Sequence, residues 1–256
     1  MRLRLGLGFA LGLFALLPLV SAAEDAPRMG QHSQTFDKDG TKLDYLLYLP
    51  PDYGKDEAKK WPLIVFLHGS GERGTDVNQV KRHGPPKIVE ADDSPLGKRF
   101  IVVSPQCPPK DRWRPEELNK LLDDVLEHYH IDKDRIYLTG LSMGGFGTWA
   151  WAEQNPGRFA AIAPMCGGGD TTQAEKLKAL PIWVFHGEMD KAVPIERDQE
   201  MVDAVKTAGD KDVKFTKYPD AGHDCWTRSY ANPELYEWFL KHKRGESAAA
   251  PAPKTE

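Results

Sequence analysis

The chain has 256 residues, with 38 acidic and 34 basic side chains and a formal net charge of −4. A mildly acidic chain has no basic stripe with which to neutralise a phosphate backbone, so we exclude nucleic acid as a partner. The length suits one α/β domain or two small ones.

The first 23 residues have the pattern of a cleavable export signal. Two arginines precede an apolar stretch over residues 5–17, and Ser21 and Ala23 are small residues at positions −3 and −1 of a cleavage site. The stretch is short and interrupted by Gly and Pro, so we expect no membrane span in the mature chain. We therefore expect a secreted or periplasmic protein cut after Ala23. Its formal charge would be −6, because two of the basic residues and no acid are removed.

Strands and helices are predicted to alternate along the rest of the chain. A partly alternating strand at 43–49 is followed by apolar runs without alternation, which are typical of strands buried on both faces of a parallel sheet. These runs are 63–67, 100–103, 136–138 and 182–185, with further strands expected at 159–164 and, more weakly, at 213–218. Helices are expected at 115–129, 195–207 and 233–242. The alternation predicts βαβ crossovers and a doubly wound sheet.

The expected organisation is a single domain over residues 35–244, without internal repeats or linkers. Residues 24–34 are expected to precede it as an N-terminal segment. Residues 245–256 contain an Ala/Pro-rich sequence without an apolar pattern, and are expected to form a disordered tail. The predicted fold class is α/β, with a mostly parallel central sheet and helices on both faces.

A Gly-x-Ser-x-Gly motif directly follows the predicted strand at 136–138. The segment 140–145 (GLSMGG) leads into a small, apolar, helix-like stretch, and this strand–turn–helix context is that of a nucleophile elbow. Small residues let the helix approach the strand while Ser142 is lifted onto the turn. The next residue, Met143, can then turn its backbone N–H towards a reacting carbonyl oxygen. The alternative interpretation is a glycine-rich turn with an incidental serine.

A second glycine-rich segment, residues 68–74 (HGSGERG), follows the predicted strand at 63–67. Glycines let the chain turn so that backbone N–H groups point into a cleft, as an oxyanion hole requires. In folds with a nucleophile elbow, one donor comes from this loop and the other from the residue after the nucleophile. The expected donors are therefore Ser70 and Met143. An ordinary strand-to-helix loop is the alternative.

An acid and a histidine follow the last two predicted strands. Asp190 lies in a loop at the carboxyl edge of the sheet, where ligands bind in open α/β folds, and Glu188 is the rival acid in the same short loop. His223 lies in a later turn. In the chain order Ser142, Asp190, His223, the histidine would accept the serine proton through Nε2. The aspartate would hold its Nδ1–H tautomer and stabilise the imidazolium.

The remaining histidines and the cysteines carry no metal-site pattern. His68 and His186 each precede a glycine at a strand end and are expected to be packed structural residues. We expect neither a metal nor another cofactor, because no pair of residues has convincing metal-ligand spacing. Which two cysteines form a disulfide, if any, is left open among Cys107, Cys166 and Cys225.

With these segments in place, the chain resembles the α/β-hydrolase superfamily over residues 35–243. More narrowly, it is similar to the secreted carboxylesterase branch related to phospholipase/carboxylesterases, dienelactone hydrolases and prolyl-oligopeptidase catalytic domains. The segments that carry the resemblance are 66–74, 104–107, 140–145, 185–190 and 222–223. The resemblance implies Ser142 as nucleophile, Asp190 as acid and His223 as base. Dienelactone hydrolases proper use a cysteine nucleophile, whereas serine stands here.

The expected function is an exported serine carboxylesterase that hydrolyses soluble short-chain or aryl esters through an acyl-enzyme intermediate. The segment 165–181 is short and polar, so no substantial lid is expected. Trp226 and Trp113 are candidates for the wall of the substrate cleft, with core packing as the alternative. A carbohydrate esterase that removes acetyl or feruloyl groups from plant polysaccharide is a sharper variant. A catalytically silent binding module is the alternative of another class. Acyl length, alcohol moiety and oligomeric state are left open.

Overall fold

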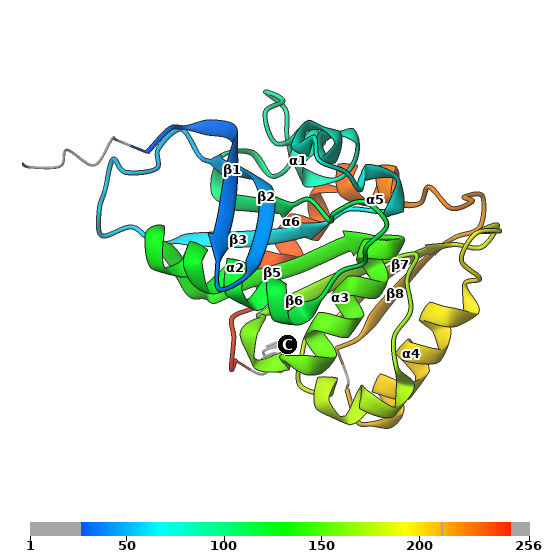
Figure 1. The fold of residues 1–256 in the computed structure, drawn as a ribbon. Helices are drawn as coiled ribbons and strands as arrows, with labels where there is room; N and C mark the ends of the chain where they lie inside the picture. Colours follow the sequence, from blue (N-terminus) through cyan, green and yellow to red (C-terminus); the bar gives the residue numbers. More distant parts are fainter. Residues whose placement is uncertain (1–26, 211, 247–256) are drawn as a thin grey trace, which may run out of the picture.

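Eight strands form one continuous sheet in the computed structural model, which describes residues 27–210 and 212–246 (Figure 1). The spatial order is β1-β2-β4-β3-β5-β6-β7-β8. β2 is antiparallel to both of its neighbours, and the strands from β4 to β8 are parallel to one another. The strands are β1 (Gly30–Lys38), β2 (Thr41–Leu49), β3 (Trp61–Leu67), β4 (Ile101–Pro105), β5 (Ile131–Leu141), β6 (Ala161–Met165), β7 (Trp183–Gly187) and β8 (Lys214–Tyr218). The predicted α/β class with a mostly parallel sheet is confirmed.

The centre of the sheet is buried on both faces, as the unbroken apolar runs predict. Every residue of β3, β4 and β6 is buried, because helices cover both sides of these strands. Neighbouring residues of β5 show the two faces directly: Leu138 belongs to one hydrophobic core and Tyr137 to the other. β8 closes one edge of the sheet and is only partly covered.

Helices cover the two faces in separate layers (Figure 1). One layer contributes Trp149 and Val202 to the core that contains Leu138, and the other contributes Phe239 to the core that contains Tyr137. The first layer is α2 (Pro115–His128), α3 (Met143–Gln154) and α4 (Glu196–Thr207). The second layer is α1 (Pro85–Ile88), α5 (Trp226–Ala231) and α6 (Pro233–Leu240). Helices on both faces are the arrangement that the sequence predicted.

The sheet begins at Gly30, so β1 includes residues that were expected to precede the domain. β1 pairs with β2 along its whole length, and the two strands are joined by Asp39 and Gly40, both with positive φ. Such a two-residue turn matches the twist of a hairpin. The sequence of β1, GQHSQTFDK, has few β-branched or apolar residues, so its pattern does not predict a strand.

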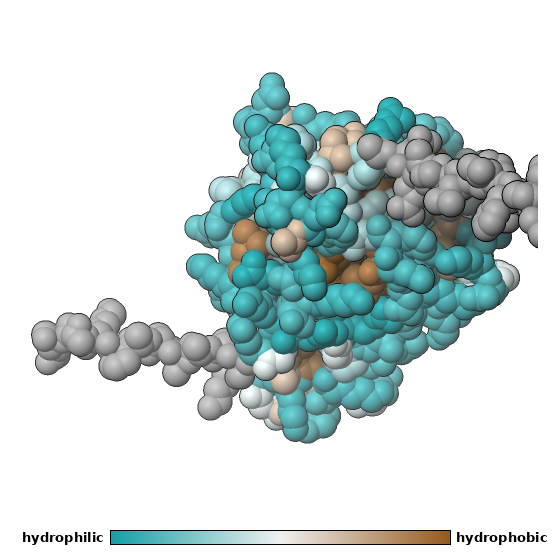
Figure 2. All heavy atoms as spheres, turned by 90° about the vertical axis from the view of Figure 1, so that its left-hand side faces the viewer, coloured by the Kyte–Doolittle hydropathy of each residue, from teal (hydrophilic) through white to brown (hydrophobic). Residues whose placement is uncertain are grey.

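The connection between β6 and β7 contains only a short 3₁₀ segment, η5 (Thr171–Leu177), and no substantial lid lies over the part of the chain described. The face in Figure 2 is mostly hydrophilic, with hydrophobic side chains visible in small hollows. Among the described residues, the exposed large hydrophobic side chains are those of Met29 and Met189. No helix within 27–246 has both the length and the apolar character needed to cross a bilayer. The predicted leader (1–23) and residues 247–256 of the predicted tail lie outside the described residues.

Candidate active site

The predicted elbow connects β5 to α3, and its serine has an unusual backbone conformation. Ser142 has φ 52° and ψ −117°, a region that side-chain-bearing residues rarely adopt. The conformation is fixed from both sides. The Ser142 N–H donates to the Met165 carbonyl at 2.9 Å, and its carbonyl accepts from the Phe146 N–H at 3.0 Å. The serine is therefore held at the junction of strand and helix at the carboxyl end of β5.

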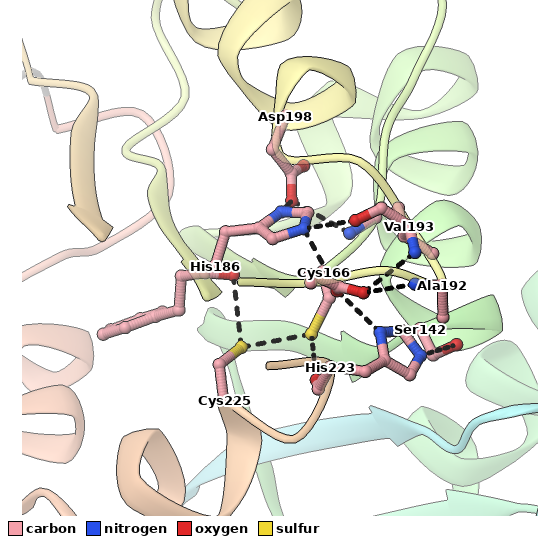
Figure 3. Close-up of polar contacts among 11 residues, drawn as sticks. Ser142, Cys166, His186, Ala192, Val193, Asp198, His223 and Cys225 are labelled. Atoms are coloured by element: carbon pink, nitrogen blue, oxygen red, sulfur yellow. Dashed lines mark hydrogen bonds and ion pairs between the residues drawn. The ribbon is translucent and has the colours of Figure 1, made fainter. Parts of the chain in front are cut away.

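Ser142, His223 and Asp190 form one hydrogen-bonded series, of which Figure 3 labels Ser142 and His223. His223 Nε2 lies 3.0 Å from Ser142 Oγ, and His223 Nδ1 lies 2.7 Å from Asp190 Oδ2. Because a carboxylate oxygen only accepts, the proton of the neutral ring lies on Nδ1. The lone pair on Nε2 then faces the serine hydroxyl, which is the arrangement of a nucleophile beside its general base.

The Asp190 carboxylate is completely buried yet well supplied with donors. Its Oδ1 accepts from the backbone N–H groups of Ala192 at 2.8 Å and Val193 at 2.9 Å. Burial alone would raise the pKa of Asp190, but the hydrogen bonds from His223, Val193 and Ala192 outweigh it and hold the pKa below its ordinary value. The rival acid, Glu188, is exposed. The structure thus brings Asp190 to the histidine.

The two expected oxyanion donors lie at the start of two helical segments. Met143 is the first residue of α3, so its N–H has no acceptor inside the helix. Ser70 is the first residue of the 3₁₀ turn η1 (Ser70–Glu72). His68 Nδ1 lies 2.6 Å from the Gly69 carbonyl oxygen, and that carbonyl belongs to the same trans peptide as the Ser70 N–H. Because the two groups of a trans peptide point in opposite directions, this bond turns the Ser70 N–H away from the buried ring.

His68 is a neutral structural residue, as expected from its place at a strand end. Its Nε2 accepts from the Cys107 N–H at 2.9 Å, so the ring proton is on Nδ1, where it donates to the Gly69 carbonyl. Burial lowers the pKa of His68 to about 4. The ring therefore stays uncharged at neutral pH and orients the loop that carries Ser70.

The low pKa of His68 predicts an acid-labile fold. Between pH 6.5 and 4 the unfolded chain binds a proton at this histidine and the folded chain does not, so the free energy of unfolding falls as the pH drops. The loss should be about 3 kcal/mol at pH 4 and absent above pH 6.5. Urea unfolding of the wild type and His68→Asn across this range should show that the variant loses less stability. An unchanged slope in His68→Asn would contradict this account.

The two candidate wall tryptophans lie beside the site but are mostly buried. Trp226 is 9% exposed and meets the His223 ring edge-on, with 5.1 Å between ring centroids. Trp113 is 8% exposed and donates through Nε1 to the His68 carbonyl at 3.1 Å. Trp113 also lines a pocket of about 590 Å³ that reaches Met143. The lining residues are Arg112, Trp113, Arg114, Pro115, Glu116, Met143, Phe146, Gly147, Ala150 and Gln154.

The three cysteines are buried free thiols, and two of them, Cys166 and Cys225, lie close to the backbone of His223. Cys166 Sγ and Cys225 Sγ are 3.1 Å apart, and the Cys166 thiol donates to the His223 carbonyl at 3.2 Å. Potential metal-ligand atoms of Cys166, Asp190 and His223 lie within 4.8 Å of one another. Burial raises the pKa of the Cys166 thiol, which disfavours the thiolate that a metal needs. Two of these three residues, Asp190 and His223, also belong to the Ser142 series.

The sequence analysis did not predict a second acid–histidine pair, Asp198 and His186, which lies next to Asp190. His186 was expected only to pack at a strand end, and Asp198 was not singled out. In the structure both side chains are completely buried and lie 2.8 Å apart, Nδ1 to Oδ2 (Figure 3). A possible signal was the position of Asp198 in the first turn of a helix that follows the Asp190 loop.

Comparisons with known proteins point to esterases and related hydrolases. The family model described as Dienelactone hydrolase family matches residues 110–249, more than half of the chain. A bifunctional acetylxylan esterase/xylanase of Neocallimastix patriciarum is 30% identical over 226 residues, which cover 79% of this chain and 30% of that protein. An S-formylglutathione hydrolase of Rattus norvegicus is 28% identical over 156 residues, covering 49% of this chain and 52% of that protein. The chain therefore spans about half of these relatives' length or less.

Solved structures share the fold. The crystal structure of a thermostable esterase has a TM-score of 0.76 and 35% sequence identity, covering 84% of this chain and 63% of that chain. A ferulic acid esterase has a TM-score of 0.62 and 19% identity, covering 81% of this chain and 95% of that chain. The second likeness concerns the fold alone.

Proposed function

This chain belongs to the dienelactone hydrolase family, and we propose that it is an exported serine carboxylesterase that hydrolyses soluble short-chain or aryl esters. Esterase relatives support hydrolase activity in general. The observation that carries the serine mechanism is the hydrogen-bonded series Ser142–His223–Asp190, with 3.0 Å and 2.7 Å between its polar atoms. The export-signal pattern of residues 1–23 supports a secreted or periplasmic location.

In the proposed reaction His223 Nε2 takes the proton from Ser142 Oγ as the oxygen attacks the ester carbonyl carbon. The negative charge that develops on the carbonyl oxygen would be held by the backbone N–H groups of Ser70 and Met143. His223 then returns the proton to the departing alkoxide, which leaves as the alcohol. Water then attacks the acyl carbon while His223 takes its proton; the bond from that carbon to Ser142 Oγ breaks, His223 returns the proton to Oγ, and the carboxylic acid is released. Asp190 holds the His223 tautomer and stabilises the imidazolium in both halves of the reaction.

The surroundings of the series favour a soluble ester. The β6–β7 connection is short, and few large hydrophobic side chains are exposed in the described part of the chain, so nothing there provides an oil-binding surface. The pocket beside Met143 has Trp113 and Phe146 among its walls, which suits an acyl chain or an aromatic ring.

A carbohydrate esterase that removes acetyl or feruloyl groups from plant polysaccharide is the sharper candidate. The acetylxylan esterase/xylanase relative, at 30% identity, favours this variant. Rates should be measured on p-nitrophenyl esters from acetate to decanoate, on methyl ferulate and on acetylated xylan. The carboxylesterase proposal expects kcat/KM to be highest for acetate or butyrate and to fall with chain length. Turnover of xylan or ferulate would favour the carbohydrate variant, and indifference to both would reject it.

Labelling by a fluorophosphonate separates the enzyme from a silent binding module. The reagent reacts with an activated serine, so the wild type should be labelled and Ser142→Ala should not. Circular dichroism of both proteins checks that they are folded. An unlabelled but folded wild type would favour the binding module over the enzyme.

A further inference from the structure

His186 lies between two buried carboxylates, those of Asp190 and Asp198. Figure 3 shows its ring beside Asp198. His186 is near the end of β7, and its ring is completely buried. Its Nδ1 lies 2.8 Å from Asp198 Oδ2, and its Nε2 lies 2.9 Å from the Val193 carbonyl oxygen and 3.3 Å from Asp190 Oδ2. The series that starts at Ser142 therefore continues beyond Asp190 through a second histidine to a second aspartate.

The partners of the His186 ring define its protonation state. The Val193 carbonyl can only accept, so Nε2 carries a proton. The Asp198 carboxylate already accepts from the Trp149 indole N–H at 2.8 Å and from the Gly167 backbone N–H at 2.9 Å. Asp198 also lies in the first turn of α4, where the helix dipole favours a negative charge. An ionised Asp198 accepts from Nδ1 as well, so both ring nitrogens carry protons and the ring is an imidazolium.

The electrostatic balance agrees with this assignment. Burial alone would lower the pKa of His186, but the hydrogen bond and charge of Asp198, the Val193 carbonyl and the charge of Asp190 raise it above the ordinary value. Without a cation between them, two buried carboxylates would each disfavour ionisation of the other.

We propose that His186 is a buried imidazolium that positions Asp190, keeps it ionised and sets the pH range in which His223 acts as a base. This inference rests on the proposed function, because it assigns His186 a role in the reaction of Ser142. His186 touches no reacting atom, so it is a positioning residue.

The charged groups around His186 and Asp190 determine in which direction the pH dependence of kcat/KM should change when His186 is replaced. His186 faces Asp198 from α4 and Asp190 from the loop after β7; Asp190 faces His223, and Cys166 lies beside them as a neutral thiol. A positive charge at His186 opposes protonation of His223 and of Asp190. Removal of that charge would let either group bind a proton at higher pH, and either event stops the proton transfer from Ser142. The acid limb of kcat/KM should therefore move to higher pH.

Nitrogen NMR of ¹⁵N-histidine-labelled protein tests the charge without any turnover. In the wild type and in Ser142→Ala, both ring nitrogens of His186 should be protonated at pH 7. Assignment comes from the signals lost in His186→Gln. A neutral His186 ring at pH 7 in the folded protein would overturn the proposal. This measurement stays valid if His186→Gln fails to fold, because Asp198→Asn also removes a partner of the ring and changes its signals.

The pH profile tests the role in the reaction. In His186→Gln, whose amide can still donate towards Val193, the acid limb of kcat/KM on p-nitrophenyl acetate should move up by about one pH unit. Activity at pH 9 should fall much less than activity at pH 6. The matched control is His242→Gln, a histidine that packs against Trp238 and should keep the wild-type acid limb.

The outcomes separate this proposal from the proposed function. If His186 were only structural, His186→Gln would lower activity equally at every pH, and that result would overturn the positioning role. If the wild type neither turns over esters nor reacts with the fluorophosphonate, the proposed function fails, while the NMR result on the His186 charge still stands or falls separately.

Discussion

Ser142→Ala should lower kcat/KM on p-nitrophenyl acetate by about 10⁶-fold, a loss comparable to that seen when a serine nucleophile is removed from a catalytic triad. The remaining rate would come from binding and from the backbone donors of Ser70 and Met143, which the substitution leaves in place. The midpoint of thermal unfolding should change little, because alanine must adopt the same positive φ of 52° as serine. Initial rates and a thermal melt of the same sample check both parts.

Two acid variants show whether a loss of activity comes from breaking the Ser142–His223–Asp190 series or from disturbing the loop after β7 that carries Asp190. Asp190→Asn should cost about 10⁴-fold, because the amide no longer holds the His223 tautomer or balances the imidazolium. Glu188→Gln changes an exposed acid two residues earlier and should keep wild-type activity. A Ser142→Ala protein with more than a tenth of wild-type activity would refute the serine mechanism. Equal losses in the two acid variants would refute the role of Asp190.

The central strands and the order of the site segments are well predicted by the sequence, because local pattern is enough to reveal them. The runs 63–67 and 182–185 are apolar at every position, and burial on both faces of a parallel sheet requires that. The elbow is equally local, since its glycines and serine stand within one turn. The carboxyl ends of parallel strands share one edge, so residues after β5, β7 and β8 were expected to meet there.

Features that depend on long-range pairing escaped sequence analysis. β1 has a polar sequence and is a strand because it pairs with β2 over its whole length, so its neighbour rather than its own propensity decides its structure. His186 looked like an ordinary packed histidine because its charge depends on Asp198, which reaches it from the first turn of α4. No local pattern states where that helix packs. The walls of the pocket beside Met143 come from α2, α3 and the loop before α2, and among these residues the sequence analysis named only Trp113 as a candidate wall.

Gly144→Ala should destabilise the fold more than substitutions of the polar side chains of the site. A Cβ atom at this position would lie 1.9 Å from the Leu67 carbonyl oxygen and 2.8 Å from the His68 carbonyl oxygen, both of them backbone atoms. The Leu67 carbonyl belongs to β3 and cannot move without shifting that strand, so α3 must move away from the sheet. We expect a loss of about 3 kcal/mol or more in the free energy of unfolding, which is about 10 °C in the midpoint for a domain of this size.

The same contact sets the distance between the two expected oxyanion donors, so this substitution should also affect the reaction. Met143 begins α3, and Ser70 lies just beyond the strand that Gly144 touches; moving the helix away from β3 separates their N–H groups. Protein that remains folded below the midpoint should therefore lose roughly 10²-fold or more in kcat, as expected for a lost donor. Gly157→Ala is the matched control, because a Cβ there meets nothing within 4 Å. If Gly144→Ala melts and turns over like Gly157→Ala, close approach of helix and strand does not organise this site.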